Sequence, residues 1–370
     1  MKRYERIVIK VGTTIIAGES GRIDRDRARS LAEQVASARR RGVDVALVSS
    51  GAIAAGMEKL GMGARPEDVE TLQAVAAVGQ GLLLRMYTDM LGDCGVTAGQ
   101  LLLTQHDMTH RQQYLNARRT MGRLFAMGVV PVINENDTVA TEEITFGDND
   151  TLAALVASLA DADLLVLLTD TEGLYTANPR EHQDATLLDR VECITGDIES
   201  LAGEPGSELS SGGMYSKVQA AKVAVTSGVP TVIADGRKTG IVSDILDGKP
   251  VGTYFPASRR VRSKKHWIGY ARRTRGRLSV DGGAAKAVED EGGSLLPAGV
   301  VEVEGEFGVG DCVDIIGPGD RPIGRGLTSY GAGEARRIMG LRTGEVSDVL
   351  GEEGCEIIHR DVLVVFDGDD

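Results

Sequence analysis

The chain has 370 residues, of which 42% are hydrophobic and 26% charged, and its net charge is −13. At about 150 residues per domain this length predicts two domains, and the acidic balance disfavours non-specific binding to nucleic acids or anionic membranes. No apolar run approaches the roughly 18 residues of a membrane span. The residues from Met1 to Lys10 contain no signal-peptide core, and the four cysteines form no C-x-x-C pair. We therefore expect a cytoplasmic protein without a membrane partner or a disulfide framework.

Apolar, strand-like runs alternate with helix-like segments through the first two thirds of the chain. In chain order the runs are residues 7–11, 43–48, 99–103, 129–133, 164–168 and 229–234. Helical periodicity marks segments between them, including 25–41, 71–91 and 216–227. This alternation predicts an α/β fold, a three-layer sandwich in which helices cover both faces of a mostly parallel sheet.

The composition changes after Pro256. Residues 259–277 contain nine Lys and Arg and no Asp or Glu, which indicates an exposed connector. Beyond it, short alternating runs lie between glycine-rich turns, the pattern of a small, mainly β domain with one helix at 333–339. We expect a first domain at 1–258, a basic connector at 259–275 and a second domain at 276–370.

Acidic and amide side chains crowd the region that follows the run at 129–133. Six acidic residues lie between Glu135 and Asp150, among them Asp137, and Asn149 precedes a helix-like segment. Each of these residues alone is also common in turns and helix caps. Carboxylates this close repel one another unless cations or donors gather around them, and parallel sheets bind ligands at the carboxyl ends of their strands. The cluster predicts a site for a cationic partner, a metal ion or a polar substrate.

Two lysines beside glycines suggest phosphate binding. Lys10 ends the first run just before Gly12, where an unpaired ammonium would be costly to bury; a side chain that reaches the surface is the alternative. Lys217 follows the glycine-rich loop at 210–216, whose spacing does not match a P-loop. Ser50, at the start of another helix-like segment, fits either an anion site or a simple N-cap.

Thr169 and Asp170 follow the run at 164–168, at the same edge of the predicted sheet. A hydroxyl and a carboxylate in this position could hold the base or the ribose of a nucleotide. An ordinary turn is the alternative interpretation.

Together these motifs resemble the amino-acid kinase family, and within it the branch that phosphorylates free glutamate. The motifs are Val-Gly-Thr at 11–13, Val-Ser-Ser-Gly-Ala-Ile-Ala-Ala-Gly at 48–56, Ala-Val-Gly-Gln at 77–80, Leu-Asn-Ala-Arg at 115–118, Pro-Val-Ile-Asn-Glu-Asn-Asp at 131–137, Gly-Asp-Asn-Asp at 147–150, Leu-Thr-Asp at 168–170, Gly-Leu-Tyr-Thr-Ala-Asn-Pro at 173–179 and Gly-Gly-Met at 212–214. The resemblance covers residues 1–258 in order, and residues 276–370 are similar to a PUA domain.

The resemblance implies the amino-acid kinase fold and ATP-dependent phosphorylation of the γ-carboxylate of L-glutamate, the first step of proline biosynthesis. By the same implication, Lys10 and Lys217 are catalytic and Asp150 holds them, while Ser50, Asp137 and Asn149 bind glutamate. The implied ATP-binding residues are Lys10, Thr169, Asp170, Ser211, Gly212, Gly213, Met214, Tyr215, Ser216 and Lys217. Mg²⁺ enters with ATP and has no assigned protein ligand. Proline is the expected inhibitor, a homo-oligomer (dimer or tetramer) the expected assembly, and glutamyl phosphate reductase a further partner.

Two alternatives stay open from the sequence. PUA domains often contact RNA, but residues 275–352 contain eight Lys and Arg against fourteen Asp and Glu, whereas RNA binding needs a positive surface. Within the same fold, the acceptor could instead be aspartate, N-acetylglutamate, a nucleoside monophosphate or carbamate. The acidic and amide motifs favour free glutamate among these.

Overall fold

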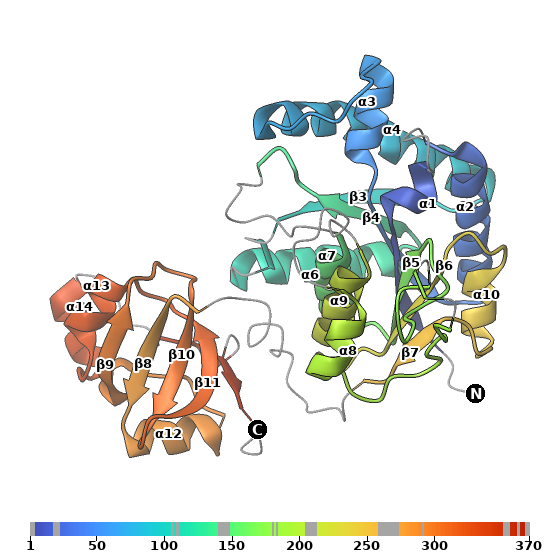
Figure 1. Cartoon of the computed structure of the whole chain (residues 1–370). Helices are drawn as coiled ribbons and strands as arrows, with labels where there is room; N and C mark the ends of the chain where they lie inside the picture. The colour runs from blue at the N-terminus through green and yellow to red at the C-terminus, as the bar shows by residue number, and fades with distance from the viewer. Residues whose placement is uncertain are drawn as a thin grey trace. The chain divides into compact units, whose positions relative to one another are not determined.

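The chain folds into two compact units, each built around its own β-sheet. The computed structural model describes residues 4–17, 23–104, 107–108, 111–139, 149–179, 181–182, 184–203, 213–257, 274–290, 292–350, 356–360 and 363–366. The first unit holds strands β1 to β7 and the second holds β8 to β12 (Figure 1). No helix in the described ranges has both the length and the apolar character needed to cross a membrane.

A sheet of seven strands forms the centre of the first unit. Its strands are β1 (Arg6–Val11), β2 (Asp44–Ser49), β3 (Ala98–Leu103), β4 (Val130–Glu135), β5 (Leu164–Thr169), β6 (Thr231–Asp235) and β7 (Thr253–Phe255). They lie in the order β3-β4-β2-β1-β5-β6-β7, and all neighbours are parallel except β6 and β7. The six predicted strands are therefore present and parallel.

Helices cover both faces of this sheet. They are α1 (Thr13–Ala17), α2 (Arg25–Arg40), α3 (Ala52–Leu60), α4 (Val69–Asp93), α6 (Arg111–Ala126), α7 (Asn149–Leu159), α8 (Gly196–Leu201), α9 (Met214–Thr226) and α10 (Ile241–Leu246). Helices α2, α4 and α10 share one hydrophobic core with the sheet, while α7 packs on β1, β2, β4 and β5 and is paired with α9 (Figure 1). The predicted three-layer α/β/α architecture is confirmed.

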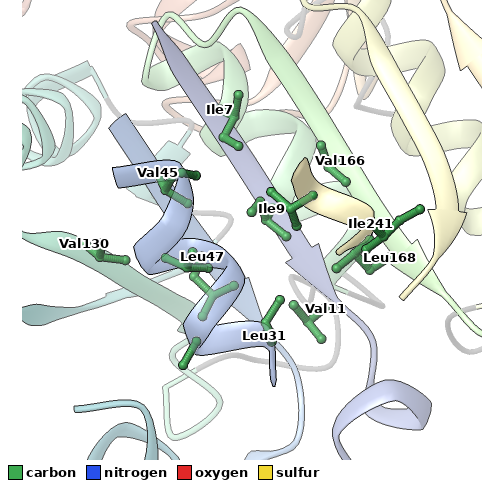
Figure 2. Close-up of a cluster of buried hydrophobic side chains, with 14 of the residues drawn as sticks. Ile7, Ile9, Val11, Leu31, Val45, Leu47, Val130, Val166, Leu168 and Ile241 are labelled. Atoms are coloured by element: carbon green, nitrogen blue, oxygen red, sulfur yellow. The ribbon is translucent and has the colours of Figure 1, made fainter. Parts of the chain in front are cut away.

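The central strand β1 sends its side chains alternately to the two faces. Ile7, Ile9 and Val11 are fully buried in the core that includes Leu31 of α2 and Ile241 of α10 (Figure 2). Because side chains alternate along a strand, Lys10 points to the opposite face, where α7 lies. An apolar strand buried on both faces thus carries one charged side chain into the interior.

The second unit contains a sheet of five strands in the order β12-β11-β10-β8-β9. Its elements are β8 (Gly276–Val280), α12 (Gly282–Glu289), the 3₁₀ helix η2 (Pro297–Gly299), β9 (Val300–Gly305), β10 (Cys312–Gly317), β11 (Arg321–Leu327), α13 (Ala332–Ile338), α14 (Thr343–Leu350) and β12 (Leu363–Val365). The predicted helix at 333–339 corresponds to α13. Two further helices, α12 and α14, accompany it and were not predicted.

The two unpredicted helices contain glycines that lower helix propensity by about 1 kcal/mol each relative to alanine. Helix α12 forms nevertheless, because the Asp281 carboxylate accepts a hydrogen bond from the backbone N–H of Ala284 at 2.7 Å and the helix buries Ala285 and Val288. The basic connector predicted at 259–275 lies almost entirely outside the described residues. The proposed domain boundaries therefore stay predictions.

Candidate active site

Four parallel strands of the first unit bring the predicted site residues to one edge of the sheet. Lys10 lies in β1, Ser50 directly follows β2, Asp137 follows β4, and Thr169 ends β5. The backbone N–H of Ser50 donates to the carbonyl oxygen of Val11 at 3.1 Å, so the β1–β2 pairing continues to the edge itself. This carboxyl edge is where open α/β sheets bind ligands.

Strand β4 is longer than predicted. It ends at Glu135 instead of residue 133, because β3 pairs with it in register as far as Leu103 opposite Glu135. Helix α7 likewise starts at Asn149, which was expected to precede the helix, so Asn149 and Asp150 form its first turn. Polar side chains that were expected in loops therefore lie on the last residues of a strand and in the first turn of a helix.

Lys10, Asp150 and Lys217 form a buried ionic trio. The Lys10 ammonium lies 2.5 Å from Oδ1 of Asp150, and the Lys217 ammonium lies 3.1 Å from Oδ2. Only 3% of each lysine side chain is exposed, and none of the Asp150 side chain. One carboxylate from α7 therefore holds two cations, from β1 and α9, at fixed positions.

The ionic trio sets the protonation of Asp150. Burial on its own would raise the pKa of this carboxyl, but the charges of Lys10 and Lys217, together with hydrogen bonds from Lys10 and Ser216, bring its pKa below the usual aspartate range. The Ser216 hydroxyl donates to Oδ2 of Asp150 at 2.9 Å. Asp150 is thus a carboxylate at neutral pH, and the trio carries one excess positive charge.

Helix α9 begins at the same place. Gly213 is its N-cap and contributes no side chain to the cap, and Met214, Tyr215 and Ser216 form the first turn before Lys217. The first N–H groups of a helix have no acceptor within the helix, so they attract anions. Ser211 and Gly212, which the sequence assigned to the same site, lie outside the described residues.

A second, uncharged network surrounds Asn149. Its Nδ2 donates to the Ser49 carbonyl oxygen at 3.2 Å, to Oγ of Ser50 at 3.0 Å and to Oδ1 of Asn134 at 2.7 Å, so that two hydrogens are shared among three acceptors. Oδ1 of Asn134 also accepts from the backbone N–H of Glu135 at 2.9 Å. A carbonyl can only accept and a backbone N–H can only donate, so both amide orientations are fixed. The Ser50 oxygen accepts within this network, and no acceptor for its own hydrogen is found among the described residues, so this hydrogen is available for a ligand.

Asp137 lies in the turn after β4 and is half-buried. Burial raises its pKa above the usual aspartate value, while its own backbone hydrogen bond and the charge of Arg65 lower it in part. Arg65 is exposed, in the segment between α3 and α4. Within the described ranges the two side chains form no direct ion pair, so Asp137 can accept a cationic group.

Thr169 and Asp170 lie at the end of β5, where the Thr169 hydroxyl donates to the Asp170 carboxylate at 3.2 Å. The neighbouring strand β6 ends in Asp235, which faces Thr169 in the register and binds the side chain of Arg237 through both of its oxygens at 2.9 Å. Arg237 in turn is attracted by Asp170. The ends of β5 and β6 therefore form one connected polar surface.

Sequence reasoning gave no role to Asn134 or Tyr87, which the structure connects to the site. The hydroxyl of Tyr87, in α4, lies 2.9 Å from Oγ of Ser49. Asn134 lies inside the motif at 131–137 that the sequence had singled out, so its position in that motif was the available signal. No pattern distinguishes Tyr87 from an ordinary core residue on an amphipathic helix.

The described residues do not fit a metal ion held by the protein. No group of three His, Cys, Asp or Glu side chains among them could ligate one. The Asp150 carboxylate, which is the most central acid, is already occupied by two ammonium groups.

Comparison with known proteins identifies the family. The model of the amino acid kinase family matches residues 5–235, and that of the PUA domain matches residues 276–350. A glutamate 5-kinase from Moorella thermoacetica is 47% identical over 99% of this chain and 97% of its own length. One from Syntrophotalea carbinolica is 46% identical over 99% of this chain and 98% of its own length.

A solved isopentenyl phosphate kinase shares the fold, with a TM-score of 0.50 and 19% identity over 68% of this chain and 99% of that structure. The matches cover the seven-stranded sheet with its ionic trio and extend into the second unit. The chain therefore belongs to the amino acid kinase family, and within it to the group of the glutamate 5-kinases that carry a C-terminal PUA domain.

Proposed function

We propose that the chain transfers the γ-phosphoryl group of ATP to the γ-carboxylate of L-glutamate, forming L-glutamyl 5-phosphate for proline biosynthesis. One observation carries this proposal: Asn149 and Asp150 are neighbours in the first turn of α7, and they serve two different networks. Asn149 organises neutral donors and acceptors around Ser50, while Asp150 holds two buried lysines. The glutamate carboxylate would bind at the neutral network and the γ-phosphate of ATP at the two lysines, so the two reacting groups would lie side by side.

The chemistry needs positive charge rather than a base. A glutamate carboxylate has a pKa of about 4.3, so it is already ionised at neutral pH. One of its oxygens attacks the γ-phosphorus, the bond from that phosphorus to the β,γ-bridging oxygen breaks, and ADP leaves with that electron pair. No proton has to move. The barrier comes from bringing two anions together in line, which fixed cations lower.

Lys10 and Lys217 would supply these cations. Asp150 prevents the two ammonium groups from repelling each other, and the start of α9 adds free N–H groups for phosphate oxygens. Mg²⁺ would be carried on the phosphates of ATP, where it neutralises part of their charge, and we assign it no protein ligand. Thr169 and Asp170 would hold the nucleoside part of ATP at the ends of β5 and β6.

Glutamate binding would use the neutral network and Asp137. The hydroxyl hydrogen of Ser50 suits a carboxylate oxygen, and the Oδ1 acceptor of Asn149 and the carboxylate of Asp137 suit the α-ammonium group. A cytoplasmic location is part of the proposal, since Cys94, Cys193 and Cys312 are free thiols.

The direct test is formation of hydroxamate from ATP, Mg²⁺, hydroxylamine and L-glutamate, in parallel with aspartate and N-acetylglutamate. We expect signal with L-glutamate alone, together with equimolar ADP. Hydroxamate formed from another acceptor, and none from glutamate, would identify that acceptor as the substrate instead. No hydroxamate from any of the three acceptors would contradict the proposed reaction.

We propose further that proline competes with glutamate, because both present a cationic nitrogen and an α-carboxylate to the same groups. Inhibition by millimolar proline should be strong at low glutamate and disappear at high glutamate. Activity insensitive to proline at low glutamate would contradict this. Homo-oligomerisation and transfer of the labile product to a reductase stay predictions from the family.

A further inference from the structure

Helix α4 touches both chain segments that we assign to glutamate binding. One segment is 49–52, at the end of β2 and the start of α3, and the other is the end of β4 at Glu135. These contacts come from Gly79, Gln80 and Tyr87 of α4. The Ala-Val-Gly-Gln motif at 77–80, which the proposed reaction leaves without a role, contains two of the three.

Tyr87 is connected to the Ser50 carbonyl group through the Ser49 hydroxyl. Its ring is fully buried, and burial raises the pKa of its phenol, so the hydroxyl keeps its proton. The Ser49 hydroxyl donates to the Ser50 carbonyl oxygen at 3.0 Å and lies 2.9 Å from the Tyr87 hydroxyl. A serine hydroxyl has one hydrogen, so Tyr87 must be the donor to Ser49. The relay runs from α4 through Ser49 to the peptide group next to the Ser50 side chain.

Gln80 attaches the same helix to the other segment. Its Nε2 donates to the carbonyl oxygen of Glu135 at 3.2 Å, two residues before Asp137. The backbones of α4 and α3 are also in direct contact. A Cβ atom built on Gly79 would lie 1.7 Å from the Ala52 carbonyl oxygen, and a Cβ atom built on Gly56 would lie 2.0 Å from the Val75 carbonyl oxygen. Helices in such close contact cannot slide independently.

We propose that α4 positions the two glutamate-binding segments relative to each other, with Tyr87 and Gln80 as its positioning residues. The ionic trio, by contrast, is held by β1, α7 and α9. Disturbing α4 should therefore weaken glutamate binding and leave ATP binding intact. This inference rests on the proposed glutamate kinase function.

The test uses two variants of the full chain that remove a hydrogen bond and little volume, Tyr87→Phe and Gln80→Met. We expect the KM for glutamate to rise about three- to tenfold in each, the effect of one lost buried hydrogen bond, with kcat and the KM for ATP within twofold of wild type. Arg85→Gln is the matched control, since the side chain of Arg85 on the same helix is 81% exposed. It should change none of the three constants.

Two outcomes would overturn the inference: an unchanged KM for glutamate in both variants, or equal rises in both KM values. Thermal melting identifies a variant that fails to fold, and the other variant then decides. Failure of the proposed function is distinguishable, because wild-type protein would then form no hydroxamate from glutamate. If the wild type is active and both variants have wild-type kinetic constants, only the proposed role of α4 is contradicted.

Discussion

The two halves of the candidate site solve different physical problems with different side chains. The phosphoryl half consists of three formal charges, almost completely buried, in which each lysine is bound to Asp150. The glutamate half consists mainly of amides, hydroxyls and backbone groups, oriented by a backbone N–H that can only donate and a carbonyl that can only accept. Buried charges act at a distance and stabilise a developing charge, whereas neutral hydrogen bonds act only at the correct geometry. The first half suits catalysis and the second suits recognition.

The largest expected effect follows from removing the charge that holds the phosphoryl half together. In Asp150→Asn two buried ammonium groups lose their common counter-ion, so they repel each other and move from their positions. We expect kcat to fall about 10²- to 10³-fold, as when a preorganised electrostatic group is lost. Steady-state hydroxamate kinetics measure it.

Asp244→Asn is the control, because it removes a carboxylate whose lysine partner, Lys249, is mostly exposed. Its kcat should match wild type. If Asp150→Asn kept near-normal kcat while folded, the ionic trio would not be the catalytic half.

A smaller effect is expected from the only charge that we assign to the glutamate half. Asp137→Asn should raise the KM for glutamate about 10- to 100-fold, since a charge-assisted hydrogen bond to the α-ammonium group contributes about 1.5–3 kcal/mol. The kcat and the KM for ATP should change little. A fall in kcat as large as that of Asp150→Asn would show that the two halves cannot be separated.

The nucleoside contacts should give a weaker effect still. Thr169→Val removes a hydroxyl at nearly constant volume, so we expect a several-fold rise in the KM for ATP, as for one neutral hydrogen bond. The KM for glutamate should stay constant. Titration of a fluorescent ATP analogue would confirm the loss directly, and an unchanged affinity would exclude Thr169 from the nucleotide site.

The smallest expected effect concerns stability against pH. Asp150 has a lowered pKa in the folded chain, so its contribution is complete above the unfolded-state pKa of about 3.9 and is lost as pH falls through the folded-state value. Urea unfolding between pH 5 and 3 should therefore show a steeper loss for wild type than for Asp150→Asn, by up to about 1.4 kcal/mol per pH unit. Parallel curves would mean that folding does not lower the pKa of Asp150.

The strands and the phosphoryl half could be predicted from the sequence because each left a local signal. A doubly buried strand needs consecutive apolar residues, and Lys10 stands out within one. Lys217 was marked by its glycine loop. The sequence does not show that both lysines bind the same carboxylate. Asp150 lies 67 residues from Lys217 along the chain, and only the tertiary structure brings them together.

The hydrogen bonds of the glutamate half could not be predicted in this way. The contact between Asn149 and the Ser49 carbonyl spans 100 residues, and it depends on β2 and β4 ending, and α7 beginning, at the same edge. Polar residues such as Asn134 are equally common in turns, so their type does not reveal their partners. The short helix α12 was missed because its cap and its burial outweigh the low propensity of its two glycines.

The excess charge of the ionic trio has a consequence for how ATP arrives. The chain carries a net charge of −13, so at low ionic strength it repels a polyanion over long distances. The single positive charge of the trio acts only near the sheet edge, within the Debye length of about 10 Å at 0.1 M salt. Moderate salt should therefore screen the repulsion first and speed up the encounter with nucleotide, opposite to the usual behaviour of basic phosphate-binding proteins.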